Sequence, residues 1–595
     1  ATTYDKASLV MIPSGYKDDK LYSIKPTDGS GDFTFSRDGA GASPATRVNA
    51  SGLIEKGRTN ELLQSNNFGT TWVNSNTTET GGQSGYDGSS DAWQLTAAST
   101  GSSRIIGQNN ATTGVSTFSV YAKAGNINYL ALENGTDFAY ISLIDGSVGN
   151  SGGTNYITYT STDVGGGWWR VSITFNKVAS SDLRIYLASS GTSTAVNSGD
   201  YIYIQDAQLE QGLVATDYIE TTTAPVSAGL LGDMPRLDYH NPDSPTPNSC
   251  PSLLLEPSRV NLFHQSEYYN AYYTRDGVSV TDNALTSPEG LQNASKLVED
   301  SANSKHRIGK ATFPSGTQRT LSVFAKAGER NYISLFENNA VGNDVKGTIF
   351  NLSNGTLSIN NSPTYYSNPT IEPIGSSGWY RCSVTWTPAS LSVPSFGVSA
   401  DGLENTYQGD GTSGIYIYGT QLEEGSYPTS YIPTYGSAST RGVDVANKLS
   451  ASSLIGQTEG TIYCELKFSA LTGAEDLGIW MRTGATSYNE MIALFIGNDF
   501  KAKASVRSSA SQEVLIASEV LSEGTIKMAF AYKQNDFVFY VNGVSVGTDT
   551  NGNVPTCDQI YLAGYPDGGT RRAENKQTLL FKSRLTNAEL AALTA

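Results

Sequence analysis

Cysteine, histidine and methionine are scarce in this sequence, which has 4 Cys, 3 His and 5 Met among 595 residues. The cysteines lie far apart, without the CxxC spacing of a zinc site or the density of a disulfide framework: Cys250, Cys382, Cys464 and Cys557. We therefore expect unpaired, mostly buried thiols in a protein made in a reducing cytosol. The three scattered histidines are too few for a transition-metal site.

Charged residues are also few, at 16%, and the net charge is −17. An acidic chain disfavours nucleic acid and acidic membrane surfaces as partners, so we expect neither. No apolar run approaches the ~18 residues of a membrane span. Residues 1–6 lack the charged-then-apolar order of a signal peptide, so we expect a soluble protein without a cleaved secretion signal.

The residues that are abundant favour β-structure. Tyr numbers 34 and Gly 61, and short runs of Tyr, Thr, Ser, Val and Ile are separated by Gly, Asn and Asp. This is typical of an all-β chain. Residues 117–123 alternate strictly, with Phe118, Val120 and Ala122 on one face, and residues 169–175 do the same.

One stretch occurs twice and organises the chain. Residues 55–65 return as residues 256–266, with Glu, Arg, Asn, Gln and Ser in the same register. Later landmarks repeat in order: residues 119–125 with 322–328, residues 168–170 with 379–381, and residues 208–210 with 421–423. A self-match of this kind predicts two copies of one module in tandem.

We predict five segments. Residues 1–57 form a lead-in and attachment region, 58–222 the first jelly-roll module, 223–258 a Pro-rich linker, 259–440 the second module, and 441–595 a further β-sandwich. Strands at roughly ten-residue spacing indicate two-sheet sandwiches. The fold class is therefore all-β. In the last segment Asn542-Gly543 predicts a tight hairpin turn, and Thr586 with Glu589 predicts a capped final helix.

Two sets of motifs carry a resemblance. The module start (Asn60, Phe68 and Trp72), the Ala-Lys-Ala-Gly of residues 122–125 and the Gln-Leu-Glu of residues 208–210 resemble jelly-roll modules of bacteriophage structural proteins, which are similar to carbohydrate-binding jelly rolls. The junctions at residues 44–55, 235–259 and 431–444 resemble those of phage head-fibre and tail-fibre proteins. The Tyr-Val-Asn-Gly of residues 540–543 and the final helix are similar to a laminin-G or concanavalin-A-like lectin domain.

The resemblance implies a virion protein, made in the host cytoplasm and built as a homotrimer. It would attach to other virion proteins through residues 1–57 and present glycan-binding surfaces to a host. Weak sugar binding at single sites gains strength when sites are repeated, which is a physical reason to repeat a module.

Catalytic patterns are missing. No GxSxG, HExxH, Walker or dinucleotide motif occurs in a suitable context, and the three histidines lie within residues 240–306. Glycoside hydrolysis needs only two carboxylates, and Glu133 and Glu337 correspond between the modules, but a Glu shared by a repeat is more simply a structural residue. We expect no enzyme and no catalytic residue.

For ligand binding, exposed aromatic rings are the side chains on which sugars stack. Trp168 and Trp379 fall opposite the apolar strand face, and Trp480 shares a strand face with Arg482. We predict these four residues as carbohydrate-binding candidates. No cofactor is required; a structural calcium is a further hypothesis, with Asp206 as the ligand that the resemblance implies, although the second module has Gly419 at that place.

The repeated stretch itself is interpreted as a structural seam. Its predicted seam residues are Glu55, Arg58 and Asn60 in the first copy and Glu256, Arg259 and Asn261 in the second. We expect the two arginines to pair with Glu or with backbone carbonyls and to hold successive domains at fixed angles.

Three hypotheses remain open. The first is a phage head or tail appendage that binds host glycans. The second is a purely structural decoration of the capsid or tail that binds no ligand. The third is a polysaccharide-degrading enzyme with binding modules.

Overall fold

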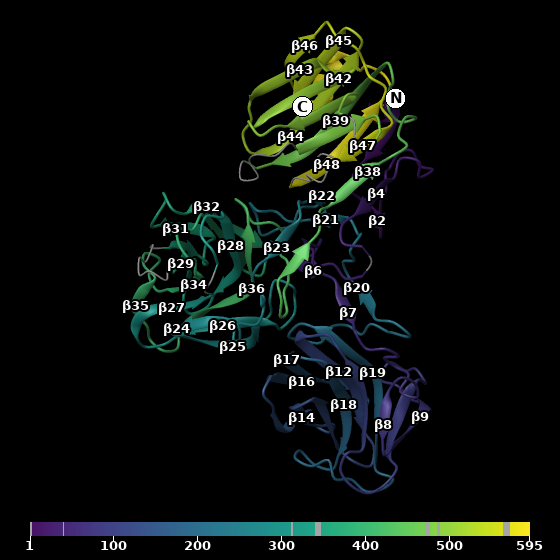
Figure 1. Cartoon of the computed structure of the whole chain (residues 1–595), viewed down its shortest axis with the longest axis vertical. Helices are drawn as coiled ribbons and strands as arrows, with labels where there is room; N and C mark the ends of the chain where they lie inside the picture. The colour runs from purple at the N-terminus through teal and green to yellow at the C-terminus, as the bar shows by residue number, and fades with distance from the viewer. Residues whose placement is uncertain are drawn as a thin grey trace.

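The computed structural model describes residues 3–39, 41–310, 313–338, 347–469, 477–484, 488–562 and 572–595. Its strands form three two-sheet β-sandwiches joined by short connectors (Figure 1). The predicted all-β class is confirmed, because these residues contain only two helices, α1 (Thr3–Lys6) and α2 (Asn587–Thr594). Within the same ranges, no helix is long and apolar enough to cross a membrane.

The first module is the lower sandwich in Figure 1. Its strands are β8 (Val73–Ser75), β9 (Thr77–Gln83), β10 (Ala92–Ala97), β11 (Ile105–Asn110), β12 (Gly114–Ala124), β13 (Tyr129–Asn134), β14 (Asp137–Ser142), β15 (Val148–Gly152), β16 (Tyr156–Gly165), β17 (Trp168–Lys177), β18 (Ser181–Ala188) and β19 (Tyr201–Gln211). One sheet has the order β16-β17-β12-β19-β10-β9 and the other β15-β14-β13-β18-β11-β8.

The second module lies to the left in Figure 1 and repeats this topology. Its strands are β24 (Thr274–Asp276), β25 (Val278–Leu285), β26 (Ala294–Glu299), β27 (Asn303–Gly309), β28 (Arg319–Ala327), β29 (Tyr332–Glu337), β30 (Thr348–Asn351), β31 (Thr356–Asn360), β32 (Ser367–Ile374), β33 (Trp379–Trp386), β34 (Pro394–Ser399), β35 (Thr406–Gln408) and β36 (Gly414–Glu424). The sheet orders β32-β33-β28-β36-β26-β25 and β31-β30-β29-β34-β27-β24 match the first module strand for strand, and β35 adds to β27. The predicted duplication is therefore visible in the strand pairing.

The third sandwich, which we call the hub, stands at the top of Figure 1 and collects strands from separate parts of the chain. They are β1 (Leu9–Met11), β2 (Tyr16–Lys17), β3 (Lys20–Leu21), β4 (Phe33–Ser36), β21 (Arg236–Asp238), β22 (Ser252–Leu255), β38 (Val445–Lys448), β39 (Glu459–Phe468), β40 (Leu477–Arg482), β41 (Met491–Ile496), β42 (Lys501–Ser508), β43 (Ser511–Val520), β44 (Gly524–Lys533), β45 (Asp536–Val541), β46 (Val544–Asp549), β47 (Gln559–Leu562) and β48 (Ala573–Phe581). One sheet runs β21-β22-β48-β39-β44-β45-β46 with β1 on β48, and the other runs β2-β3-β4-β38-β47-β40-β41-β42-β43.

The structure thus differs from the predicted organisation of residues 1–57 and 223–258. Leu9 pairs with Leu580, β4 pairs with β38, and Leu253 of β22 pairs with Asn575. These segments carry apolar side chains that fill the hub core, and Leu9, Phe33 and Leu253 are fully buried in it. The chain begins in the hub, leaves for the first module, returns, leaves for the second module and returns again.

Short two-stranded ribbons carry the chain between the sandwiches. They are the hairpin β5 (Thr46–Val48) with β6 (Ile54–Lys56), the pair β7 (Arg58–Asn60) with β20 (Val226–Ala228), and the pair β23 (Arg259–Asn261) with β37 (Ser439–Arg441). Each of the last two brings together the start and the end of one module, so each module leaves and rejoins the rest of the chain at a single neck.

Local predictions in the hub hold. Asn542 and Gly543 adopt positive φ values of 46° and 81°, as the hairpin turn between β45 and β46 requires. Helix α2 has the predicted capping box, in which Thr586 and Glu589 satisfy each other's backbone amides. All four cysteines are unpaired, and all except Cys250 are buried, as expected.

A buried ionic network fixes the point where the chain returns to the hub. Arg236 pairs with Glu256 at 2.8 Å and also with Asp444, while Arg441 reaches the same Glu256 at 2.9 Å. Arg37 adds a 3.0 Å pair to Asp444, and all five side chains are fully buried. Burial alone would raise the pKa of Glu256, but the Arg441 and Arg236 guanidiniums hold this pKa well below its ordinary value.

Replacement of Glu256 by Gln should destabilise the hub strongly. The amide leaves Arg236 and Arg441 buried without their shared counter-charge, and breaking a buried ion pair from one side costs about 3–5 kcal/mol. Urea unfolding followed by tryptophan fluorescence measures the loss in free energy of unfolding.

Glu329→Gln is the matched control, because Glu329 pairs with Lys296 at 2.8 Å on the surface and should lose no more than about 1 kcal/mol. Equal losses in the two variants would contradict the role assigned to the network. Because the folded pKa of Glu256 is depressed, its contribution should be present above the unfolded pKa of about 4.3 and be lost as the pH falls.

Candidate functional site

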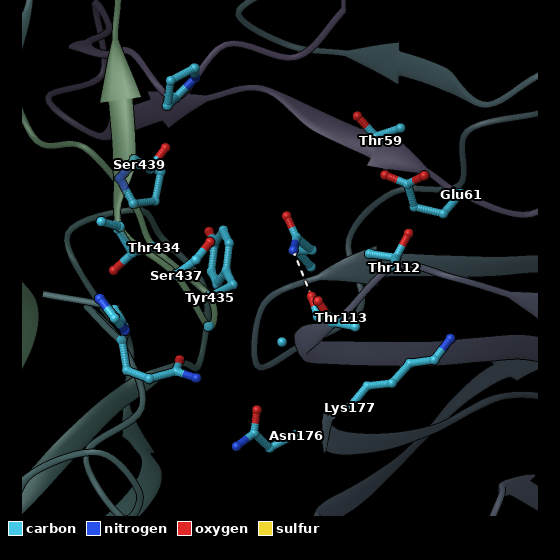
Figure 2. Close-up of a pocket in the computed structure, with 18 of the residues that line it drawn as sticks. Thr59, Glu61, Thr112, Thr113, Asn176, Lys177, Thr434, Tyr435, Ser437 and Ser439 are labelled. Carbon is cyan, nitrogen blue, oxygen red and sulfur yellow. Dashed lines mark hydrogen bonds between the residues drawn. The ribbon is translucent and has the colours of Figure 1, made fainter. Parts of the chain in front are cut away.

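A cleft of about 800 Å³ lies where the two modules meet. Its walls come from the β11–β12 loop and the ends of β17 and β19 in the first module, from residues 264–272 in the second, and from residues 433–439 that follow β36. Figure 2 shows Glu61, Thr112 and Lys177 on one side and residues 434–439 on the other.

A second buried ionic cluster holds the modules on either side of this cleft. The Lys56 ammonium lies 2.7 Å from Glu267 and 3.1 Å from Glu289, and Arg58 also pairs with Glu289. Burial and the neighbouring Arg58 would lower the pKa of Lys56, but the two carboxylates raise it, so the lysine stays charged. The neck of the first module is thereby bonded to the second module. The hydroxyl of Tyr418 completes the cluster by donating to Glu289 at 2.8 Å.

The modules also touch directly, backbone to backbone. The Val115 amide donates to the Tyr435 carbonyl at 2.6 Å, beside Gly114 at φ +96°. A Cβ on Gly114 would lie 1.7 Å from the Tyr435 oxygen, so only glycine permits this approach. Gly114 and Tyr435 both line the cleft, so this contact joins its two walls.

The lining is mainly polar. Hydroxyl and amide side chains dominate it: Thr59, Thr112, Thr113, Thr434, Ser437, Ser439, Asn176, Gln211 and Gln265. An aromatic element comes from His264 and Tyr272, whose rings stack with centroids 4.9 Å apart. Tyr272 has a φ of +74°, unusual for a bulky residue, and Thr71 at the corresponding place of the first module has +66°, so this turn belongs to the shared fold.

Burial shifts the pKa values of two charged residues on the first-module wall, Lys177 and Glu61. Lys177 is only 2% exposed, and its ammonium donates to the Asn110 carbonyl at 2.6 Å. Burial lowers the pKa of Lys177 to about 8, because the attraction of the more distant Asp182 and Glu61 offsets it only in part. Burial raises the pKa of Glu61, against the effects of Thr112 and Lys177.

The prediction that four residues form exposed carbohydrate-binding surfaces is wrong. Trp168, Trp379, Trp480 and Arg482 are at most 3% exposed, and a sugar cannot stack on a covered ring. In the first module the Tyr86 ring covers this sheet face by stacking on Tyr121 at 3.7 Å, next to Trp168. In the second module Ile54 of β6 packs over the same face in a cluster with Trp379.

In the hub, Trp480 stacks on Phe495 at 5.7 Å within a buried cluster that includes Tyr561. The Arg482 guanidinium lies 4.6 Å from the Tyr561 ring centroid. Sequence alternation placed these side chains on one strand face correctly, but it carries no information about the segment that covers that face.

Asp206, predicted as a calcium ligand, occupies a β-bulge. Its φ is +53°, Gly419 in the second module has +58°, and the strand register shifts at both places. The aspartate and the glycine correspond because a bulge needs a residue that tolerates positive φ. Tyr86 donates to the Asp206 carboxylate at 3.0 Å, and burial raises the pKa of Asp206 to about 6. Across the described ranges, no group of three or more His, Cys, Asp or Glu is arranged to hold a metal ion.

The repeated asparagines have identical roles in the two modules. Asn60 donates to the Ala207 and Ile219 carbonyls at 3.1 and 2.8 Å, and Asn261 donates to the Thr420 and Ile432 carbonyls at 3.0 and 2.9 Å. Both are fully buried. Each therefore fastens the closing segment of its own module.

The repeated Glu and Arg positions differ between the copies. Glu55 pairs with Arg47 at 2.9 Å across the β5–β6 hairpin, whereas Glu256 lies in the buried network of the hub. Arg58 pairs with Glu289 of the second module and reaches the Gln211 carbonyl at 3.5 Å. Arg259 stays near its own module, 4.0 Å from Glu423 and 3.1 Å from the Ser258 carbonyl.

Sequence reasoning did not find the cleft. Its residues come from many separate stretches of the chain between Ala42 and Ser439. Its polar residues are largely Ser, Thr, Asn and Gln, which attract no attention in an all-β sequence rich in them. The one available signal was Lys177, a lysine at the end of an alternating apolar strand.

No protein-family model matches the chain, and no curated protein matches it. Among solved structures, it is similar to a CBM40 domain of a Ruminococcus gnavus sialidase (15% identity, 24% of this chain and 84% of that chain, TM-score 0.21). It is also similar to the tandem CBM22 domains of Xyn10C from Paenibacillus barcinonensis (13% identity, 60% and 93%, TM-score 0.19) and to mouse laminin α1 domains LG4-5 (12%, 53% and 89%, TM-score 0.16). Likenesses at these scores carry no argument about function.

Gly114→Ala should separate the two modules without unfolding either. The new Cβ collides with the Tyr435 carbonyl, which breaks the backbone contact between the two modules. We expect a larger radius of gyration in small-angle scattering and faster proteolysis of the necks.

Gly165→Ala is the matched control. Gly165 has a similar φ of +89° in the same module, but a Cβ there meets nothing within 4 Å, so the variant carries the backbone strain without the collision. If both variants keep the wild-type scattering profile, the contact does not hold the modules together.

Proposed function

We propose that the protein binds glycans in the cleft between its two modules and does so as an appendage of a bacteriophage particle. The observation that supports binding is the lining of the cleft, in which hydroxyl and amide side chains surround the His264–Tyr272 stack. Sugars are recognised by such a combination, with hydrogen bonds to the hydroxyl groups and apolar contact with a ring. A volume of about 800 Å³ has room for an oligosaccharide.

Binding is favoured over hydrolysis at this site. Of the described residues that line the cleft, Glu61 is the only carboxylate, whereas glycoside hydrolysis needs two that face each other across the bond. The proposal therefore assigns the cleft to recognition alone.

The appendage role is supported by the resemblance of the junction sequences to those of phage fibres and by the rigidity of the joints. Fully buried ion pairs at the hub and at the module neck suit a part that displays binding sites at a fixed distance from a particle. The same rigidity supports a second candidate, a structural decoration that binds no glycan. The proposed trimer would bring three clefts to one host surface and raise the overall affinity through multivalency.

Glycan-array binding by the purified protein tests the proposal. The variant that replaces both His264 and Tyr272 by Ala should lose at least about tenfold in affinity, because the apolar part of the wall is gone. Tyr22→Ala, which changes a 38% exposed tyrosine on the hub, should bind as the wild type does.

If the protein binds no glycan at multivalent concentration, glycan binding is overturned and the structural decoration without a ligand is favoured. Gold-labelled antibody against the protein, viewed on purified phage particles, tests the location. Particles that carry no label would overturn the appendage role.

A further inference from the structure

Lys177 is a buried lysine in the lining of the cleft. It lines the cleft wall at 2% exposure, and its ammonium donates a hydrogen bond to the neutral Asn110 carbonyl at 2.6 Å. In the part of the chain that the structure describes, it forms no ion pair with a carboxylate. The other buried lysine of this region, Lys56, has Glu267 and Glu289 in contact.

A buried ammonium without a counter-ion is unfavourable, because it loses its hydration and gains little in return. The second module shows that the cost is avoidable, since Pro388 follows the equivalent strand, β33, two residues after Trp386. The lysine is therefore a special feature of the first-module wall and not a requirement of the fold. Asp182 and Glu61 offset the burial of Lys177 only in part, so the ammonium still has room for a counter-charge supplied by a ligand.

We propose that the cleft binds an acidic glycan and that Lys177 receives the carboxylate of a uronic-acid or sialic-acid residue. This inference rests on the proposed function and narrows its ligand class. The hydroxyl and amide side chains contact the ring hydroxyls, while the ammonium forms a charge-assisted hydrogen bond with the carboxylate. The cleft is otherwise poor in negative charge, with Glu61 as its one carboxylate among the described residues.

The surrounding charges give the binding a defined pH dependence. The groups that act on Lys177 are Glu61, at the neck of the module, and Asp182, on β18, while Arg58 and His264 line the same cleft. With its pKa lowered to about 8, Lys177 is protonated below that pH and attracts a carboxylate there, and the attraction is lost as the pH rises through 8. The raised pKa of Glu61 acts in the same direction, because acidification removes its repulsion of the ligand.

The experiment compares ligands that differ only in charge. Trigalacturonic acid and its methyl ester share one scaffold, and a sialylated trisaccharide with its methyl ester provides the same comparison for the other source of a carboxylate. Calorimetry at pH 6.5 should show at least about tenfold tighter binding of one acid than of its ester, with the preference falling between pH 7 and pH 9. The ligand pair in which the acid binds more tightly than its ester shows whether the carboxylate belongs to a uronic acid or to a sialic acid.

Variants assign the preference to Lys177. Lys177→Met should abolish the difference between acid and ester while leaving ester binding intact, and Lys177→Arg should retain it. Lys123→Met, which changes a lysine on the outer face of the first module away from the cleft, should leave the preference unchanged. Circular dichroism checks that each variant is folded. If Lys177→Met does not fold, the pH series on the wild-type protein still tests the role of Lys177.

The outcomes separate the two proposals. Equal binding of acid and ester by the wild-type protein would overturn the acidic ligand but leave glycan binding in place. A preference that survives in Lys177→Met would overturn the role of the lysine. Binding of none of the four ligands, together with a blank glycan array, would overturn both.

Discussion

The buried ion pairs around Glu256 are the constraint on which the arrangement of the whole chain depends. Arg37 follows the first hub strands, Arg236 lies on β21, and Arg441 and Asp444 precede β38, so each return of the chain to the hub contributes to one network. Buried charges must be paired, and these side chains are all shielded from water. Satisfying the charges therefore fixes where both module necks leave the hub, and the cleft between the modules inherits that geometry.

The two modules share a fold but differ in the contacts that they make with the connectors. Both close with a buried asparagine, at Asn60 and Asn261, and both carry a bulge at Asp206 or Gly419. The modules differ at the outer face of the sheet that contains β12 in the first module and β28 in the second. In the second module Ile54 from the connector packs on this face, whereas in the first module Tyr86 of the same module covers it. The second module thus binds the connector that leads into the first module.

Periodicity and the internal repeat were sufficient to predict the sandwiches. Phe118, Val120 and Ala122 all enter the first-module core, as strict alternation requires, and the equivalent strands β12 and β28 occupy equivalent places in their sheets. Connectivity was not predictable, because hub strands such as β1 and β22 are too short to show a period and pair with residues hundreds of positions away.

The binding site was harder still to predict. The aromatic residues that attracted attention, Trp168 and Trp379, are covered by Tyr86 and Ile54, which no strand pattern links to them. The cleft depends on how two modules meet, and that is decided by single contacts such as Lys56 with Glu267 and Gly114 with Tyr435. Such contacts join residues of ordinary type over long sequence separations, so they leave no local signal.

The way the hub is assembled also sets an order of events during synthesis. Leu9 pairs with Leu580, and β4 pairs with β38, so β1 and β4 lack these neighbours until the strands that follow the second module have been synthesised. The modules, each closed at its own neck, can fold meanwhile. Leu9 of β1 and Phe33 of β4, which are buried in the finished hub, wait for these strands to cover them. The two hub sheets are therefore completed only after both modules have been synthesised.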